Sequence, residues 1–219
     1  MQELTVPIFP LPVVVLFPHG RAPLHIFELR YRQMIEDVLS GRGLLGMVAL
    51  SDGDFRGTEI DPAVYSIGCL GRVSHHQRLP DGRFNLVVDA DQRFRILDEV
   101  QQSGKQLYRT AHVSCLAEPI IGSSEGIELS HQRAEIMHLL ETLIGPSSSE
   151  KPRLDTGLLE EKDDSSFVNN VCQAITLPTP EKQGLLEAEN VLDRATRLLV
   201  HLRFYQASVR SGETGGSLH

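Results

Sequence analysis

Residues 65–97 read YSIGCLGRVSHHQRLPDGRFNLVVDADQRFRIL, and this stretch decides the fold of the first half of the chain. Two long segments, 65–79 and 83–97, flank the tripeptide Pro80-Asp81-Gly82. Proline fixes one turn dihedral, and glycine accepts the positive φ that closes a tight turn. After the turn, apolar and polar side chains alternate, as in a strand with one wetter face. The stretch therefore predicts a long β-hairpin.

The other extended segments are shorter. Residues 4–10 are apolar but contain Pro7 and Pro10. Proline cannot donate to a sheet ladder, so we predict an edge strand or an extended lead-in there. Further extended segments are predicted at 13–17, which is a β-branched run, and at 24–27, 44–50 and 106–116.

One helix is predicted inside this β-rich half, at residues 28–39, where apolar side chains recur on one helical face. Gly41 and Gly43 end it. With Gly46 these glycines match the pattern GxGxxG. A dinucleotide site needs that pattern after a strand and before a helix, and here the order is reversed. We interpret the glycines as a helix stop.

The second half of the chain is predicted to be helical. Apolar spacing indicates one helix at 125–144 and another through 167–175, capped by Ser165 or Ser166. Thr179 is predicted to cap a third helix, with Pro180 as its first residue, that continues to about Val209. The glycine-, proline- and serine-rich residues 145–152 form a predicted linker.

These elements predict an α+β protein with two subdomains. The β-rich subdomain covers residues 1–118 and the helical one residues 119–210, and the glycine-rich tail 211–219 is predicted to be disordered. The chain has 219 residues, of which 41% are hydrophobic and 23% charged, so it can bury a core without disulfide staples.

Composition also limits the classes of function. Three cysteines without a CxxC pair support neither a zinc ribbon nor a disulfide scaffold. No apolar run approaches about 20 residues, and Glu3 and nearby prolines stand where a signal peptide would need a basic and then apolar start. We therefore expect a soluble cytoplasmic protein.

The charge balance makes nucleic acid a poor first candidate for a partner. Residues 1–118 hold 12 basic and 14 acidic side chains, and residues 119–219 hold 9 and 15. Binding to a phosphate backbone requires clustered positive charge, and no Lys/Arg stripe is present. One local group of arginines keeps RNA binding open as an alternative: Arg72, Arg78, Arg83, Arg93 and Arg95.

Residues 122–126 match the GxSxG pattern of serine hydrolases, with Ser124 at the nucleophile position. Asp155 and His201 follow in the required order. The preceding strands form hairpins rather than parallel βαβ units, so a serine-rich loop that caps the next helix is the preferred interpretation. A hydrolase acting through Ser124 stays as a third functional alternative.

No metal or cofactor is predicted. His75 and His76 are adjacent, so on a strand they point to opposite faces, and His131 and His138 are seven residues apart. No GxxxxGK[ST] sequence is present, which excludes a P-loop. The acidic residues Glu160, Glu161, Asp163 and Asp164 are interpreted as a loop leading into a helix, with partner docking as the alternative.

Several segments, in order, resemble the N-terminal domain of the ATP-dependent Lon protease. They are PIFPLPVVVLFP (7–18), PLHIFELRYRQM (23–34), IGCLGRV (67–73), LPDGR (79–83), DQRFRI (91–96) and EKQGLLE (181–187), followed by Arg194 and Leu198. The resemblance covers roughly residues 3–205. Two departures are Ala90, where relatives often have glycine, and the short polar linker 145–164.

The resemblance implies a PUA-like β pseudobarrel followed by a C-terminal helical bundle. The chain ends before the ATPase module and the Ser–Lys peptidase domain of the full protease could start. It therefore looks like a stand-alone copy of the substrate-binding domain. This implies a non-enzymatic module in protein quality control that binds polypeptide segments or a partner protein. The alternative is a PUA-like module that binds RNA or a small ligand.

The residues that carry the resemblance are expected to have structural roles. They are Pro10, Phe17, Pro18, Phe27, Glu28, Arg30, Tyr31, Asp81, Gly82, Arg93 and Phe94. Glu28 lies at a helix start, and either Arg30 or Arg93 could pair with it. The expected core residues are Phe9, Leu16, Phe17, Phe27, Tyr31 and Phe94. A binding function is expected on exposed loops and grooves near this apolar motif.

Overall fold

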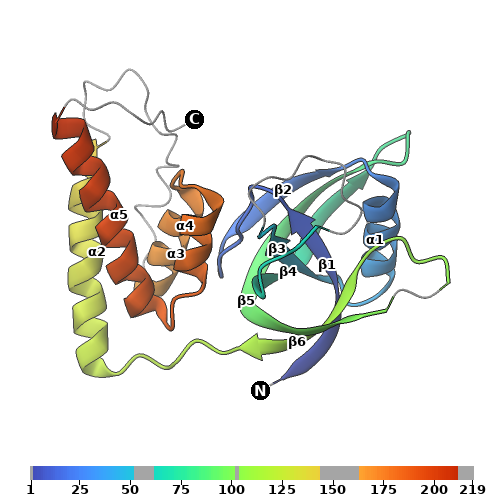
Figure 1. The fold of residues 1–219 in the computed structure, drawn as a ribbon, viewed down its shortest axis with the longest axis horizontal. Coiled ribbons are helices and arrows are strands. Elements are labelled where there is room, and N and C mark those ends of the chain that lie inside the picture. The colour runs from blue at the N-terminus through green and yellow to red at the C-terminus, as the bar shows by residue number, and fades with distance from the viewer. Residues whose placement is uncertain (1, 52–61, 102–103, 144–162, 212–219) are drawn as a thin grey trace. The chain divides into compact units, whose positions relative to one another are not determined.

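The computed structural model describes residues 2–51, 62–101, 104–143 and 163–211. The chain divides into two compact units, Met1–Ala117 and Glu118–His219. Among the described residues, the first unit contains the strands and one helix, and the second contains only helices (Figure 1). The protein is therefore of the mixed α+β class.

The first unit is built around one six-stranded sheet. Its elements are β1 (Glu3–Leu11), β2 (Arg21–Ile26), α1 (Leu29–Ser40), β3 (Leu44–Ala49), β4 (Ile67–Arg78), β5 (Phe84–Val100) and β6 (Thr110–Leu116). The strand order is β2-β5-β4-β3-β1-β6, and β5 also pairs with β6. This additional pairing closes a ring of five strands and leaves β2 outside the ring. The PUA-like character of this arrangement stays a prediction.

The long strand β5 makes this closure possible. Its first half pairs with β2, from Ile26 opposite Phe84 to Arg21 opposite Asp89. Its second half pairs with β6, beginning with Arg93 opposite Leu116. Along its other edge β5 pairs with β4 in the predicted hairpin.

The prediction of an edge strand or lead-in at residues 4–10 is wrong, because β1 pairs antiparallel with β6 and parallel with β3. The backbone N–H of Ile8 donates to Arg109 on the β6 side, whereas Leu11 accepts from Leu50 on the β3 side. Successive backbone groups alternate in direction. The nitrogen of Pro7 therefore faces the β3 side, where the paired stretch begins only at Ile8, and that of Pro10 faces the β6 side, where the paired stretch ends at Pro7. Both prolines thus place their missing donor outside the stretch that is paired on that side.

The turn of the β4–β5 hairpin has the predicted conformation. Gly82 has a φ of +80°, and its N–H donates to the carbonyl of Leu79. The Leu79 N–H in turn donates to the Arg83 carbonyl, and the Asp81 carboxylate accepts from the Arg83 N–H at 3.1 Å.

The segment at 13–17 differs from the other predicted extended segments, because it forms no strand. Its residues Val15, Leu16 and Phe17 are nevertheless buried.

Helix α1 packs its apolar face onto the strands. Tyr31, Met34, Ile35 and Val38 are buried in one cluster with residues of β1, β2, β3, β4 and β5. The helix stops as predicted: the N–H groups of Gly41 and Gly43 both donate to Val38, and Gly43 has a φ of +70°.

A second apolar cluster is centred on Phe94, which is fully buried with residues of β1, β3, β4 and β6. A Cβ placed on Gly46 or on Gly68 would lie 2.8 Å from the Phe94 Cζ atom. Both glycines are therefore needed to make room for this ring. Gly46, the last glycine of the GxGxxG pattern, thus has a packing role.

The second unit contains α2 (Ser123–Leu143), α3 (Asp164–Ala174), α4 (Thr179–Leu186) and α5 (Val191–Ser211). Two details differ from prediction. The α3 cap is Asp163, whose carboxylate accepts from the Ser166 N–H, rather than Ser165 or Ser166. The helix predicted to run from Pro180 to Val209 is two helices, and α4 begins after Pro178 instead of a Thr179 cap.

Arg194 connects three parts of the helical unit although its side chain is completely buried. It donates to the Asn169 side chain at 2.7 Å, to the Leu185 carbonyl at 3.1 Å and to the Glu118 carboxylate at 3.0 Å. Burial of a charge is costly unless the charge is paired and hydrogen-bonded. These bonds explain how a guanidinium can lie in an apolar core.

Parts of the sequence predictions lie outside the described residues. They are the linker 145–152, Asp155, Glu160 and Glu161, and the tail from residue 212 on. None of the described helices is long and apolar enough to cross a membrane.

We expect Gly82→Val to lower the free energy of unfolding by at least about 1 kcal/mol, because a β-branched residue resists the positive φ of this turn. Gly82→Asn is the control, since asparagine tolerates this conformation and meets the same neighbour, Arg32. Urea unfolding of both variants measures the difference. Equal stability of Gly82→Val and the unsubstituted chain would contradict the turn assignment.

We expect Gly68→Ala to destabilise the fold by about 1–3 kcal/mol, because its methyl group would collide with Phe94 and with the Met47 carbonyl. Gly126→Ala in α2 is the matched control. It meets only an ordinary contact at 3.9 Å and should stabilise the helix by about 0.5–1 kcal/mol. Thermal unfolding should show opposite shifts in Tm for the two variants, and shifts in the same direction would disprove the close approach at Phe94.

Candidate functional site

The first half of β5 and the paired parts of β2 and β4 carry exposed side chains on the outer side of the sheet. Side chains alternate between the two faces of a strand, so Ala22 and Ile26 enter the core while Pro23 and His25 face outward. The register aligns two outward rows across the strands: His25, Asn85 and Gln77, and beside it Pro23, Val87 and His75. We call these six side chains the hollow face.

A shallow hollow of about 340 Å³ lies on this face. It is lined by Pro23, Leu24, His25, His75, Gln77, Asn85, Leu86 and Val87. The lining combines apolar groups with imidazole and amide groups that can donate or accept hydrogen bonds. None of these eight side chains is a carboxylate, an ammonium or a guanidinium group.

His25 is held in place by two neighbours. Its Nδ1 atom is 2.6 Å from the Asn85 Oδ1 atom, and its Nε2 atom is 3.3 Å from the Arg83 Nη1 atom. The guanidinium can only donate, so Nε2 has to accept, and Nδ1 then carries the proton given to Asn85. The two contacts therefore fit the tautomer of His25 that carries a proton on Nδ1.

The charged groups that border the hollow face are neutralised in pairs. Arg83 Nε is 2.5 Å from Asp81, and the Arg83 backbone N–H lowers the pKa of the Asp81 carboxyl. Arg21 Nε is 2.7 Å from Asp89 and lowers the pKa of that carboxyl by its hydrogen bond. Both carboxylates therefore remain ionised at neutral pH, and each cancels the charge of its arginine.

An exposed apolar pair follows β2 directly. The Phe27 side chain is 61% exposed and that of Leu29 70% exposed. The prediction that Phe27 belongs to the core is therefore wrong, because Ile26 takes the inward position and its neighbour faces out. The Phe27 ring lies nearly parallel to the His25 ring, with centroids 6.3 Å apart.

Glu28, between Phe27 and Leu29, pairs with Arg30 at 2.9 Å, which settles the partner that the sequence left open. The Arg30 guanidinium lies over the Tyr31 ring, and Tyr31 contacts Phe9 edge to face. Six of the other motif residues are buried, namely Pro10, Phe17, Pro18, Gly82, Arg93 and Phe94. The structural roles expected for these residues stay a prediction.

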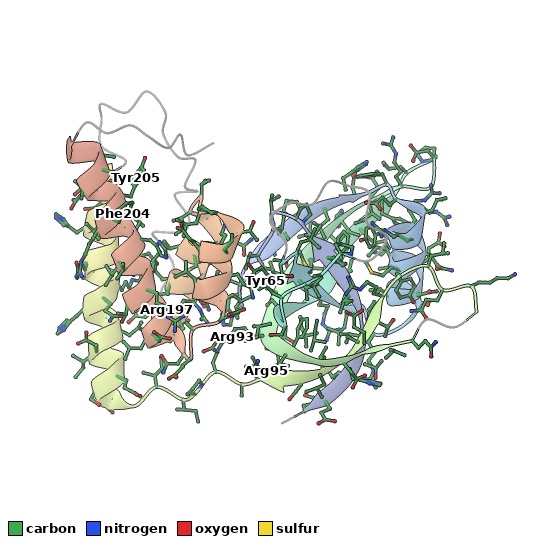
Figure 2. All side chains as sticks on the ribbon, in the orientation of Figure 1. Tyr65, Arg93, Arg95, Arg197, Phe204 and Tyr205 are labelled. Atoms are coloured by element: carbon green, nitrogen blue, oxygen red, sulfur yellow. The ribbon has the colours of Figure 1, made fainter. Side chains whose placement is uncertain are left out.

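The arginine group that kept RNA binding open does not form a free basic patch. Arg93 is only 3% exposed, although Arg95, two residues on in β5, is exposed (Figure 2). Arg78 pairs with Glu36 at 2.9 Å, and Arg83 pairs with Asp81. Arg72 donates to the Arg42 carbonyl.

The GxSxG residues have the geometry of a helix start. Helix α2 begins at Ser123, so Ser124 lies in its first turn, and the Gly122 N–H donates to the Glu125 carboxylate at 2.9 Å. A nucleophile elbow needs a sharp turn directly between strand and helix, which these residues do not make. His201 lies 3.4 Å from Glu181.

The other candidate motifs have structural partners. Asp164 accepts from Ser130 and Arg133, and Asp163 caps α3, so both acidic residues stabilise the helical unit. No group of three or more potential metal ligands occurs among the described residues. The three cysteines are free and buried.

Sequence reasoning did not identify the hollow face. Its residues come from three strands and lie far apart in the sequence, as His25 and Asn85, which are 60 positions apart, show. Only the register of β2 on β5 and of β4 on β5 brings them together. The one local signal was the alternation of polar and apolar side chains after the hairpin turn.

Comparison with known proteins gives consistent relatives. Residues 5–203 match the model of the ATP-dependent protease La (LON) substrate-binding domain. The Lon protease of Azospirillum brasilense is 26% identical over 195 residues, which are 88% of this chain and 23% of that protein. Lon protease 1 of Thermus thermophilus is 27% identical over 207 residues, which are 91% of this chain and 24% of that protein.

Solved structures show the same fold at lower identity. The N-terminal domain of the Mycobacterium avium complex Lon protease has a TM-score of 0.67 and 19% identity, covering 91% of this chain and 97% of that chain. A Lon N-terminal domain protein from Xanthomonas campestris has a TM-score of 0.58 and 18% identity, covering 90% and 98%. The chain spans about a quarter of the length of the curated relatives. Because the family model matches residues 5–203, which are most of the chain, the chain belongs to the family of Lon substrate-binding domains.

Proposed function

We propose that this chain is a non-catalytic module that binds polypeptide segments, and that the hollow face with Phe27 and Leu29 is the binding surface. The observation that carries the proposal is a hollow lined without carboxylate, ammonium or guanidinium groups, beside two exposed apolar side chains. Binding surfaces for protein are depleted of charge at their centre and enriched in aromatic side chains.

The hydrogen-bonding groups of the hollow suit a polypeptide. His25, His75, Gln77 and Asn85 offer both donors and acceptors, which match the amide groups of an unfolded chain. Pro23 and Val87 add apolar area in the row beside His25, Asn85 and Gln77. A partner without folded structure gives up chain entropy on binding, so the affinity should be micromolar or weaker.

The alternative, a PUA-like module that binds RNA or a small ligand, has less support at this face. Phosphate groups need free cations, and the two arginines that border the hollow are each paired with a carboxylate. The matched family model covers the substrate-binding domain, which supports a role without catalysis. The cytoplasmic location stays a prediction from the sequence.

We expect the chain to bind reduced, carboxymethylated α-lactalbumin, which stays unfolded, more tightly than native α-lactalbumin. Because burial of apolar surface is little screened by ions, the Kd should change less than about threefold between 50 and 500 mM salt. Fluorescence anisotropy measures it, with a single-stranded RNA as the rival ligand. RNA binding would instead weaken steeply with salt.

Phe27→Ser should weaken binding of the unfolded protein at least about fivefold, since an aromatic anchor is lost. Phe204→Ser is the matched control: Phe204 is 77% exposed on α5, in the other unit (Figure 2), and its loss should leave the Kd unchanged. No binding by the unsubstituted chain at tens of micromolar, together with salt-sensitive RNA binding, would replace the proposal with the RNA alternative.

A further inference from the structure

The outer edge of β2 offers backbone groups that pair with none of the described strands. β2 is the terminal strand of the sheet order, and β5 is its one neighbour among the described strands. The Ala90 N–H donates to the Gly20 carbonyl, so the even-numbered residues Gly20, Ala22 and Leu24 face β5. The backbone groups of Arg21, Pro23 and His25 then face away from the sheet. We call these groups the β2 edge.

The β2 edge is accessible. Arg21, Pro23 and His25 are all exposed, and within the described part of the chain β5 is the one strand that forms a ladder with β2. The nitrogen of Pro23 faces away from β5. The proline therefore removes no hydrogen bond between β2 and β5. The proline removes one outward donor and leaves those of Arg21 and His25.

We propose that an extended polypeptide segment adds to the β2 edge as an antiparallel strand, with apolar side chains at alternate positions. This inference rests on the proposed function and supplies its mode of recognition, which is backbone pairing. An incoming strand would exchange two hydrogen bonds opposite Arg21, one opposite Pro23 and two opposite His25. Backbone hydrogen bonds do not depend on the side chains of the bound segment. This mode therefore suits a module that binds unfolded segments of varied sequence.

The side chains of an added strand would lie beside the hollow face. Directly opposed residues of an antiparallel pair project to the same side. A residue opposite Pro23 would therefore extend the row of Pro23, Val87 and His75, where apolar groups dominate. This places the hollow and the β2 edge in one continuous surface.

A second copy of the chain is a weaker occupant. Two β2 edges paired antiparallel about Pro23 would oppose two prolines, so the centre would lack both donors. Each Arg21 would then face a His25 of the other copy. A strand from another protein would lose only one hydrogen bond opposite Pro23, because its own N–H could still donate to the Pro23 carbonyl. Proline on an edge strand is a known protection against self-pairing.

Hydrogen exchange of the full chain tests the mode of binding. On addition of reduced, carboxymethylated α-lactalbumin, the amides of Arg21 and His25 should exchange at least about tenfold more slowly, as paired strand amides do. The amide of Ile120, which is exposed in the other unit, is the control and should not change. Binding without slower exchange at Arg21 and His25 would overturn the pairing and leave the proposed function standing.

Two variants alter the edge in opposite directions. Pro23→Ala restores the missing donor and should tighten binding by about threefold to tenfold, the value of one added hydrogen bond. His25→Pro removes a donor and should weaken binding by a similar factor relative to His25→Ala, which loses the same side chain but keeps the N–H. Unchanged Kd values in both comparisons would refute the pairing. Absence of any binding by the unsubstituted chain would refute the proposed function as well.

Discussion

One strand with three neighbours organises the β unit. Over its 17 residues β5 pairs with β4 along one edge, while the other edge is shared by β2 and then by β6. Pairing with β6 closes the ring of strands and removes free edges from that part of the sheet. Pairing with β2 extends the sheet beyond the ring, so that β2 keeps an open outer edge. The candidate binding surface exists because these two pairings divide β5.

Packing around Phe94 stabilises the closed ring of five strands. The ring of Phe94 occupies space that only glycine leaves free on β3 and β4, at Gly46 and Gly68. The extended part is maintained differently, by α1, whose apolar face covers the inner side chains of β2 and β5. Its outer side therefore remains available to solvent and to a partner. The packed core around Phe94 and the exposed hollow face thus both depend on β5.

Local signals in the sequence predicted the elements that local chemistry determines. The hairpin at Asp81 and Gly82, the stop of α1 at Gly41 and Gly43 and the helical second half follow from turn residues and periodicity. Features that depend on distant partners could not be predicted. The two neighbours of β1, the outward position of Phe27 and the burial of Arg194 depend on registers and contacts between segments far apart. The hollow face belongs to this second group, because its polar residues look like ordinary exposed strand positions.

The most direct test is a map of backbone amide chemical shifts of the isotope-labelled chain, titrated with reduced, carboxymethylated α-lactalbumin. If the hollow face binds the unfolded protein, the largest shifts should occur on β2, on the first half of β5, on the second half of β4 and at Phe27 and Leu29. The amides of the Phe94 cluster and of α5 should remain unchanged. Largest shifts on α5 around Val200 and Phe204, with β2 unaffected, would contradict the account, since binding would then use the helical unit.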